Sequence, residues 1–422
     1  MNNPIKDKRA VLALAMLLAP TLIHAQAQSG TFDASFGTGG KVATDFAGAV
    51  AVQADGKLVV AGGVSSGFAV ARYNSNGTLD ASFGAGGKVT TDFGGQFQRA
   101  TSVALQLDGR ILVAGGSVIN QINDFAVARY NSNGTLDAGF GTGGKVITNI
   151  EGVSAQAYSV AVQQDGKVIV AGAANLDGGY NFELVRYSSN GMLDASFGAG
   201  GKVTTDFGLL DQGFSYAQAY SLALQQDGKI LLAGQAYIGT GNDFALARYN
   251  SNGTLDIGFG TGGKVITDFG TNNDGAHSLA LQPDGRIVAA GLAANRFALV
   301  RYNSWGTLDT TFGTGGKVTT RIGAFTDQAS QVVLQGDGKI VVAGRTYVAG
   351  PDFTGNFRSA LARYTNWGTL DTSFGTAGTV TMIFGGDSDV VSSIAAQPDG
   401  KIVVSGGASA NWQSSSALAR LN

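Results

Sequence analysis

The feature that most constrains this chain is a repeat that returns seven times along its 422 residues. A "DGK" or "DGR" landmark recurs at intervals of 53 to 62 residues, and an "FG" pair, an Arg and the Asp of "TLD" recur with it. Periods of this length are typical of solenoids and propellers, in which each repeat buries its apolar surface against its neighbours. The Asp residues of the landmark are Asp55, Asp108, Asp165, Asp227, Asp284, Asp337 and Asp399.

Each repeat has room for four short strands and no helix. In the second copy these are residues 102–106, 110–115, 124–130 and 144–149, with an Asp-Gly turn between the first two. Segments such as "KIVVAG" are apolar throughout, which is typical of a sheet covered on both faces. We therefore predict an all-β, seven-bladed β-propeller of four-stranded blades. A β-solenoid is the main alternative, but its rungs are usually much shorter than these repeats.

The two ends of the chain indicate how such a ring closes. The C-terminal "ALARLN" matches a third strand and stops there. Residues 29–46, "SGTFDASFGTGGKVATDF", match the connection and the fourth strand that the last repeat lacks. We therefore expect the N-terminal strand to complete the seventh blade and close the ring, with residues 28–422 as a single domain.

The first 27 residues have the pattern of a secretory signal peptide. Lys6, Lys8 and Arg9 precede an apolar run over residues 10–23 and the small-residue segment "HAQAQSG", which predicts cleavage after Ala25 or Ala27. The run is too short for a membrane span. We expect an exported protein, periplasmic or secreted, with no membrane span after cleavage. It has no Cys, so core packing must hold it together without disulfides, and we expect a monomer.

The repeated phrases resemble those of a known family. "NGTLDASFGAGGKV" and "DGKIVVAG" followed by "FALARYN" are similar to the delta-60 repeat of exported bacterial proteins, over essentially residues 30–422. The resemblance implies export and a propeller-like β-fold, and it brings no activity and no catalytic residues. The departures are local: "MLD" at 192–194, Trp at 305 and 367, and "TAGTV" at 376–380.

Composition and charge exclude several kinds of site. Charged residues are 14% of the chain and the formal net charge is −2, which excludes a nucleic-acid footprint. Beyond residue 27 the only His is His277, so a zinc site with two or more His is impossible, and without Cys there is no thiolate ligand or nucleophile. Asp274 and Ser278 flank His277, but strand neighbours point to opposite faces, so these three do not form a triad by themselves. We predict no metal, no cofactor and no catalytic residue.

The sevenfold phrase is expected to be scaffold. Its Asp-Gly pairs are hairpin turns, and the Arg of "ARY" is placed to form a latch with the Asp of "TLD". The alternative is a calcium loop, because Asn74, Asn76 and Asp80 offer oxygen atoms in "NSNGTLD". That spacing matches an EF-hand loop poorly. We therefore interpret the phrase as a structural turn.

All irregular segments are predicted to lie at one end of the blades. The uniform turns connect the first strand to the second and the third to the fourth, and we call the end of the blades that carries them the uniform face. The variable segments lie at the opposite end, which we call the variable face. Loops on a rigid scaffold are where recognition usually occurs. One position at the start of each innermost strand, beside the channel mouth, is occupied in the seven repeats by Gly48, Thr101, Tyr158, Tyr220, His277, Ser330 and Ser392.

This spread of residue types predicts an asymmetric pocket at the channel mouth. Three consecutive repeats place aromatic rings there, a surface that suits a sugar or a peptide through stacking and hydrogen bonds. The alternative is that these rings only close the mouth by packing, and both interpretations remain open. The predicted ligand-binding residues are Thr101, Tyr158, Tyr220, His277, Phe214, Tyr216 and Tyr237.

Two further features have both a functional and a structural interpretation. Trp305 and Trp367 replace the turn Asn in adjacent repeats of the uniform face, either as a partner contact or folded over their own turns. The fourth strands end in carboxylates in four repeats, which forms either a weak cation-attracting rim or a solvated edge. These residues are Asp45, Asp92, Asp206 and Asp268.

Three functions follow from these features. The first is a non-catalytic exported propeller that binds a carbohydrate, peptide or cell-envelope partner through its variable face. The second is a polysaccharide lyase or hydrolase that acts at the channel mouth of the same face, with His277, Tyr158 and Tyr220 as candidates. The third is a structural or adhesive module whose contact surface is the face that carries Trp305 and Trp367.

Overall fold

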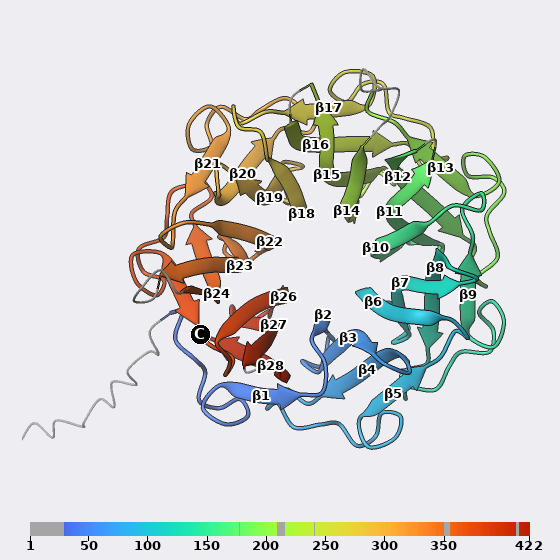
Figure 1. Cartoon of the computed structure of the whole chain (residues 1–422), viewed down its shortest axis with the longest axis horizontal. Helices are drawn as coiled ribbons and strands as arrows, with labels where there is room; N and C mark the ends of the chain where they lie inside the picture. The colour runs from blue at the N-terminus through green and yellow to red at the C-terminus, as the bar shows by residue number, and fades with distance from the viewer. Residues whose placement is uncertain (1–28, 177, 209–215, 240, 350–354, 411–412) are drawn as a thin grey trace, which may run out of the picture.

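The computed structural model describes residues 29–176, 178–208, 216–239, 241–349, 355–410 and 413–422. Over these residues the chain forms seven four-stranded antiparallel sheets arranged around a central channel, each with one strand at the channel (Figure 1). The prediction of an all-β fold with seven four-stranded blades is confirmed. In the described part of the chain, no helix is long and apolar enough to cross a membrane.

Six blades use four consecutive strands, and blade 7 combines the last three strands with the first. Blades 1 to 6 are β2–β5, β6–β9, β10–β13, β14–β17, β18–β21 and β22–β25, and blade 7 is β26, β27, β28 and β1. The innermost strands are β2 (Gly48–Val52), β6 (Gln96–Leu105), β10 (Ala155–Val162), β14 (Ala217–Leu224), β18 (Gly275–Leu281), β22 (Asp327–Leu334) and β26 (Ser388–Ala396). The second strands are β3 (Leu58–Val64), β7 (Ile111–Ile119), β11 (Val168–Leu176), β15 (Ile230–Ile238), β19 (Ile287–Ala293), β23 (Ile340–Ala349) and β27 (Ile402–Ala410).

The outermost strand of each blade is shorter than the third strand with which it pairs. The third strands are β4 (Gly67–Tyr73), β8 (Ile122–Tyr130), β12 (Gly179–Tyr187), β16 (Gly241–Tyr249), β20 (Arg296–Tyr302), β24 (Gly355–Tyr364) and β28 (Gln413–Leu421). The outermost strands are β5 (Lys88–Thr91), β9 (Lys145–Thr148), β13 (Lys202–Thr205), β17 (Lys264–Thr267), β21 (Lys317–Thr320), β25 (Thr379–Met382) and β1 (Lys41–Thr44). Four-residue outer strands leave little free edge for another chain to pair with.

The hydrophobic core lies between blades and not within any one of them. Between blades 2 and 3, for example, Leu112 and Val127 pack against Val170 and Tyr187, and all four are fully buried. The middle strands are apolar on both faces because each blade is covered by a neighbour on either side. Each buried side chain of this size stabilises the fold by roughly 1.5–3 kcal/mol.

A tyrosine and a threonine join neighbouring blades through their hydroxyl groups. The Tyr at the end of a third strand bonds to the Thr at the end of the preceding blade's outermost strand, with oxygen atoms 2.6 to 2.8 Å apart. The pairs are Tyr130 with Thr91, Tyr187 with Thr148, Tyr249 with Thr205, Tyr302 with Thr267 and Tyr364 with Thr320. Between blades 6 and 7 both members are replaced, and the apolar Leu421 and Met382 share one buried cluster. Because both residues are apolar, the joint between blades 6 and 7 has no Tyr or Thr hydroxyl group at this place that would need a partner.

The predicted latch between Arg and Asp is present in all seven repeats. The Nε atom of each Arg lies 2.7 to 2.9 Å from its Asp, and the guanidinium lies over the Phe ring of "FG". The pairs are Arg72–Asp80, Arg129–Asp137, Arg186–Asp194, Arg248–Asp256, Arg301–Asp309, Arg363–Asp371 and Arg420–Asp33. Among the described residues, six of these Arg side chains also donate to a main-chain oxygen of the next blade's turn. The latch therefore fixes a turn and a blade joint together.

The first and last strands of the described chain lie side by side in blade 7. β1 pairs antiparallel with β28, with Lys41 opposite Ala419 and Thr44 opposite Ser416 (Figure 1). The latch of this blade joins Asp33 to Arg420 across 387 residues of sequence. We call this blade the seam, because it is where the two ends of the chain meet.

The seam latch is expected to matter more than the others. Asp33 and Asp194 make matching contacts, each accepting from a Ser two residues on and each facing a Lys and an Arg. Asp33→Ala should lower the free energy of unfolding by about 3 kcal/mol, because the stranded Arg420 loses its partner and the N-terminal segment loses an anchor. Asp194→Ala should cost less, since its Arg lies in the same continuous hairpin. Denaturant unfolding of both variants tests this, and equal losses would contradict it.

Glu183 is a buried acid at a position where the other blades have Ala. Its side chain on β12 is fully buried, its Oε2 atom accepts a hydrogen bond from Thr204 at 2.8 Å, and its Oε1 atom has no partner among the described residues. Burial raises the pKa of Glu183 to about 8, against the opposing effect of the Thr204 hydrogen bond. The folded protein therefore holds this proton at neutral pH, whereas the unfolded chain releases it.

Glu183→Gln should make the protein more stable in a pH-dependent way. Because the folded-state pKa is raised, the wild type loses stability as the pH rises from about 5 to 8, whereas Gln does not titrate. The variant should unfold at similar denaturant concentrations near pH 5 and should gain on the order of 3 kcal/mol over the wild type by pH 8. Unfolding curves at pH 5, 7 and 9 measure the difference. A constant difference across these pH values would rule out the buried-acid explanation.

Candidate functional site

The variable position at the channel mouth is the site of a β-bulge in six blades. The pairing of innermost and second strands shifts by one residue around Thr101, Tyr158, Tyr220, His277, Ser330 and Ser392. Blade 1 is the exception, because Gly48 pairs regularly with Gly62. A bulge redirects a side chain out of the regular alternation of the strand. At these six positions the side chains therefore point in a direction that departs from the regular alternation of the strand.

Three of the bulged residues form a continuous row of rings. The ring centroids of Tyr158 and Tyr220 are 5.1 Å apart at an interplanar angle of 64°, and those of Tyr220 and His277 are 5.6 Å apart at 52°. The three side chains come from β10, β14 and β18, on consecutive blades, and each is partly exposed. The structure thus brings together the three aromatic residues that the sequence placed at this mouth. We call Tyr158, Tyr220 and His277 the aromatic row.

His277 is held neutral and in one tautomer. Its Nδ1 atom lies 2.8 Å from the main-chain oxygen of Ala329 in the next blade. A carbonyl only accepts, so Nδ1 carries the proton and Nε2 remains an acceptor. Burial lowers the pKa of His277, and the positive charge of Arg345 lowers it further against the effect of the Ala329 hydrogen bond. Burial also raises the pKa of both tyrosines, so their phenols stay protonated and can donate.

The side chain of Thr101, like that of His277, bonds to a main-chain oxygen of the next blade. Its hydroxyl donates to the main-chain oxygen of Ala157, 2.8 Å away, which is the residue before the bulge of the next blade. His277 contacts Ala329 at the equivalent place. The side chain of Thr101 therefore serves the joint between blades 2 and 3, and it is not joined to the aromatic row by a ring contact.

The other predicted loop residues lie beside the row or outside the described residues. Tyr216 stacks edge-on against Tyr180, with ring centroids 5.8 Å apart, and its main-chain oxygen accepts from the amide of Tyr237 at 2.7 Å. Tyr237 is partly exposed at the end of β15. Phe214 lies outside the described residues. Two of the three predicted loop aromatics thus meet through one main-chain bond.

Sequence reasoning missed several residues at this face. Tyr180 was not singled out, although its ring contacts Tyr216. In blade 6, Arg345 lies over the ring of Phe357 at 4.5 Å and donates to Gln328 at 2.7 Å. Tyr347 contacts both Phe357 and Phe325, at 5.5 and 5.7 Å between centroids. The available signal was one ring residue near the variable end of each strand, Tyr347 on β23 and Phe357 on β24.

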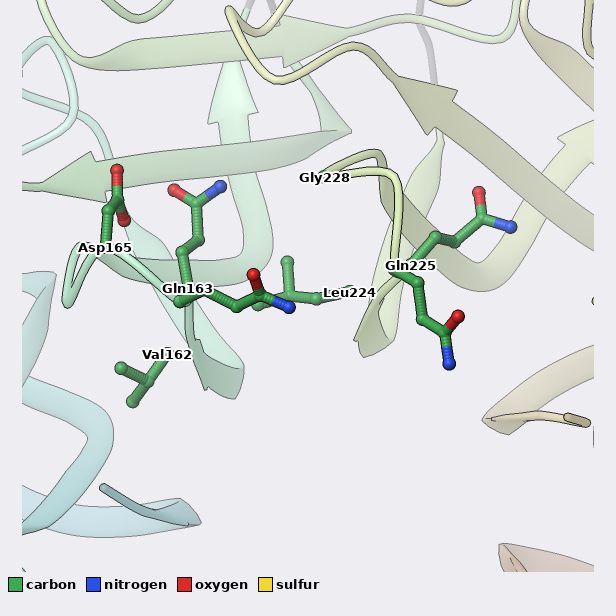
Figure 2. Close-up of a pocket in the computed structure, with 8 residues that line it drawn as sticks. Val162, Gln163, Asp165, Leu224, Gln225 and Gly228 are labelled. Carbon is green, nitrogen blue, oxygen red and sulfur yellow. The ribbon is translucent and has the colours of Figure 1, made fainter. Parts of the chain in front are cut away.

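A cavity lies at the opposite end of the two strands that carry the tyrosines. It has a volume of about 320 Å³ and is lined by Val162, Gln163 and Asp165 of blade 3 and by Leu224, Gln225 and Gly228 of blade 4 (Figure 2). The sequence predicted a pocket at the variable face, and this hollow is at the uniform face. Its Gln is repeated in all seven blades, each with a buried side-chain oxygen that has no partner in the described part of the chain. The cavity is therefore built from scaffold residues.

The uniform turns do not offer a calcium site. Asn76 accepts from the amide and hydroxyl of Thr78, and Asp80 is bound by Ser82, Lys57 and Arg72. The Ser82 hydrogen bonds, with those of the cations Lys57 and Arg72, hold the pKa of Asp80 below its usual range. The interpretation of the phrase as a structural turn agrees with these contacts.

The two tryptophans of the uniform face extend into solvent. Trp305 and Trp367 are 65% and 62% exposed, so most of each residue is accessible to solvent. Their main-chain oxygens accept from Gly260 and Gly313 of the preceding blades, at 2.8 and 2.9 Å. The backbone at these positions serves the blade joints, and the indole rings are free to contact a partner.

One group of carboxylates is arranged to share an ion. Asp243, Asp268 and Asp274 each place an oxygen atom within 4.8 Å of the others, at the variable end of blade 4. Burial and the charges of Asp268 and Asp274 together raise the pKa of Asp243 to about 6. The sequence pointed to Asp268 as part of a rim, but not to the other two, which come together only in the fold.

Comparison with known proteins places the chain in a family. The model of the "Domain of unknown function (DUF5122) beta-propeller" matches residues 53–83, 106–140, 163–197, 225–259, 282–312, 335–374 and 397–422. These segments make up more than half of the chain, so the protein belongs to the DUF5122 β-propeller family. The narrower resemblance to delta-60 repeats stays a prediction. No curated protein matches the sequence.

Solved structures share the fold at low sequence identity. A protein from Lactobacillus plantarum is 15% identical, with a TM-score of 0.52 over 83% of this chain and 90% of that one. The polysaccharide lyase Uly1 is 14% identical, with a TM-score of 0.50 over 95% and 94%. A chain of the mitotic checkpoint complex is 12% identical, with a TM-score of 0.50 over 98% of both chains. Similarities at this level establish the propeller alone.

Proposed function

We propose that this protein is an exported, non-catalytic β-propeller that binds a carbohydrate, peptide or cell-envelope partner through its variable face. The observation that carries the proposal is the aromatic row, in which Tyr158, Tyr220 and His277 touch in sequence at 5.1 and 5.6 Å. A row of partly exposed rings offers both faces for stacking and polar groups for hydrogen bonds. Of the three partner classes, a carbohydrate fits this chemistry best.

The polar groups of the row are held ready for such a ligand. The phenol of Tyr158 is a protonated donor, the phenol oxygen of Tyr220 is an acceptor because its proton is donated to Gln218, and Nε2 of His277 is an acceptor because Nδ1 is bound to Ala329. Sugar hydroxyls both donate and accept, so they match this mixture. The Tyr220 phenol donates to Gln218, which orients its ring in advance of binding. Groups that are already oriented lose less entropy when a ligand arrives.

The other bulged positions are small, which makes the mouth asymmetric. Thr101, Ser330 and Ser392 stand where the row has rings, and blade 1 has Gly48. A ligand at the channel mouth therefore meets large aromatic side chains on blades 3 to 5 and small residues on the other blades. An extended chain that lies across the mouth, such as an oligosaccharide, makes use of that difference.

Elimination chemistry on an acidic polysaccharide is the second candidate. A neutral His277 beside the phenol of Tyr220, with the cation of Arg345 near enough to lower the His277 pKa, combines a base, an acid and a group that neutralises a carboxylate. Among the described residues, His277 contacts the ring of Tyr220 and the main-chain oxygen of Ala329, and neither is a carboxylate. Binding without catalysis therefore stays the first proposal.

A glycan screen with paired variants tests these functions. The chain is screened against immobilised glycans and cell-wall fragments as wild type, as Tyr158→Ala/Tyr220→Ala and as Trp305→Ala/Trp367→Ala. The tyrosine pair should weaken binding by about tenfold or more, because two stacking contacts are lost, at an unchanged melting temperature. The tryptophan pair, on the opposite face, should bind like the wild type.

Each other outcome has a defined meaning. Loss of binding only in the tryptophan pair would move the site to the uniform face and favour an adhesive module. Ultraviolet absorbance from unsaturated products on uronate polymers, lost in His277→Gln, would establish a lyase. Binding that survives the tyrosine pair would contradict the proposed site.

A further inference from the structure

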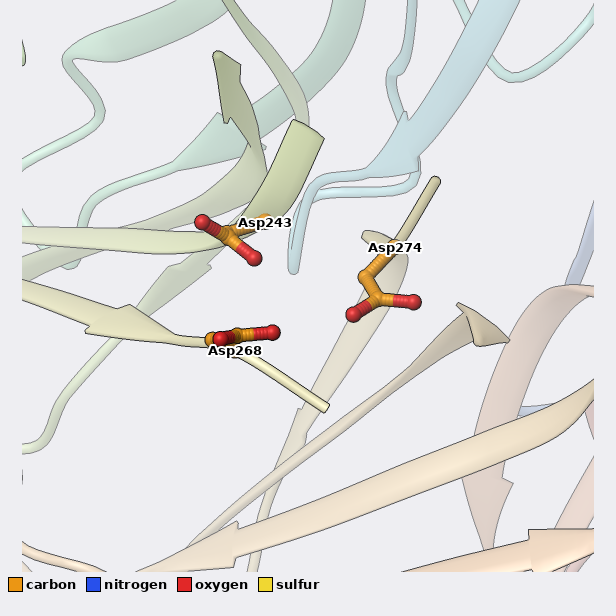
Figure 3. Close-up of side chains that lie close together, drawn as sticks. All are labelled: Asp243, Asp268 and Asp274. Carbon is orange, nitrogen blue, oxygen red and sulfur yellow. The ribbon is translucent and has the colours of Figure 1, made fainter. Parts of the chain in front are cut away.

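Three carboxylates converge at the variable end of the joint between blades 4 and 5. Asp243 lies on β16, Asp268 follows β17, and Asp274 precedes β18, and their oxygen atoms lie within 4.8 Å of one another. Figure 3 shows the three side chains pointing toward a common point from three separate segments. Two ligands on opposite sides of a calcium ion lie about 4.6–5.2 Å apart, so this spacing suits a single ion.

The cluster contains a buried carboxylate that no described residue pairs with or hydrogen-bonds. Asp243 is only 8% exposed, and it accepts no hydrogen bond and forms no ion pair with any described residue. Lys317 is the nearby cation, but its ammonium donates to the main-chain oxygen of Asp268 and lies over the ring of Phe269. A buried and unpaired carboxylate is strongly unfavourable. A cation bound from outside the chain would therefore stabilise the charged form of Asp243.

Blade 2 supplies such a partner from within. Asp243 sits beside Phe244, which pairs with Thr267, and the same register in blade 2 places Asp124 opposite Asn149. There the amide of Asn149 donates to Asp124 at 2.7 Å. Blade 4 has two carboxylates at these two places, so the internal donor is missing.

Blade 6 shows a cation in the equivalent place. Its register puts Arg358 where blade 4 has Asp243, and Arg358 lies 3.3 Å from Asp389, the counterpart of Asp274. Asp389 and Asp274 each accept from the main chain at the start of the link between blades, at Phe384 and Phe269. Equivalent places in the fold thus hold the guanidinium of Arg358 at the joint between blades 6 and 7 and three converging carboxylates at the joint between blades 4 and 5.

We propose that Asp243, Asp268 and Asp274 bind a calcium ion. All three ligands are hard oxygen donors, and neither sulfur nor imidazole contributes, since His277 is bound to Ala329. Ligands from three separate segments form an adaptable site, which suits calcium better than the strict octahedron of magnesium. The ion ties the link after β17 to β16, and this link leads into the strand that carries His277. The site is independent of the glycan proposal.

Calorimetric titration of the metal-stripped protein with calcium chloride and magnesium chloride tests the site. The wild type should bind one calcium ion with a dissociation constant of about 10⁻⁵ to 10⁻³ M and melt at a higher temperature in its presence. Asp243→Asn and Asp268→Asn should each weaken binding by about tenfold or more. Asp243→Asn should also raise the melting temperature in the absence of calcium, because it removes a buried like charge.

Asp206→Asn is the matched control. Asp206 ends β13 as Asp268 ends β17, is equally exposed, and accepts from the amide of Gly208 as Asp268 does from that of Gly270. Its opposite residue is Asn181 and not a second carboxylate. The control should bind calcium like the wild type. Absence of calcium binding in the wild type, unchanged binding in Asp243→Asn, or equal loss in Asp206→Asn would each overturn the proposal, and equal affinity for magnesium would overturn the choice of calcium.

Discussion

The arginine at the end of each third strand makes three contacts at once, and the joints of the ring depend on them. It pairs with the Asp of its own repeat, lies over the Phe of "FG", and in six blades donates to a main-chain oxygen of the next blade's turn. The stacked, nearly dry environment strengthens the ion pair, and the partner Lys or Arg of the Asp-Gly turn adds a second charge. One planar guanidinium thus orients a turn and a neighbour together, a geometry that Lys cannot supply.

The uniform and variable faces divide the work of the molecule. At the uniform face the turns, latches and tyrosine–threonine pairs repeat with little change, so they fix the distance between blades. At the variable face the same scaffold presents rings on blades 3 to 5, an arginine over a ring on blade 6, and three carboxylates at the joint between blades 4 and 5. Because the scaffold is uniform, a change of one side chain at this face alters the surface without altering the ring.

The sequence predicted the fold well because the repeat fixes it many times over. Seven copies of the latch, the Asp-Gly turn and the apolar middle strands left few alternatives, and the contact of Tyr158, Tyr220 and His277 followed from their shared position on adjacent blades. The bulges were not predictable, since a one-residue shift leaves no mark in an alternating strand. Asp243 and Asp274 could not be paired from the sequence, because they lie 31 residues apart on different blades. Glu183 stood out by type, but its burial depends on the neighbouring blade.

The seam has a consequence for the order of events as the chain is made. β1 precedes every other described strand and β28 follows them all, yet they are partners in one sheet. Until β28 emerges from the ribosome, β1 has no neighbour to pair with, and blades 1 and 6 each expose an apolar face. Contacts between segments this far apart form slowly. The propeller therefore remains an open arc until β28 has been made, and a chain that lacks either β1 or β28 cannot complete blade 7.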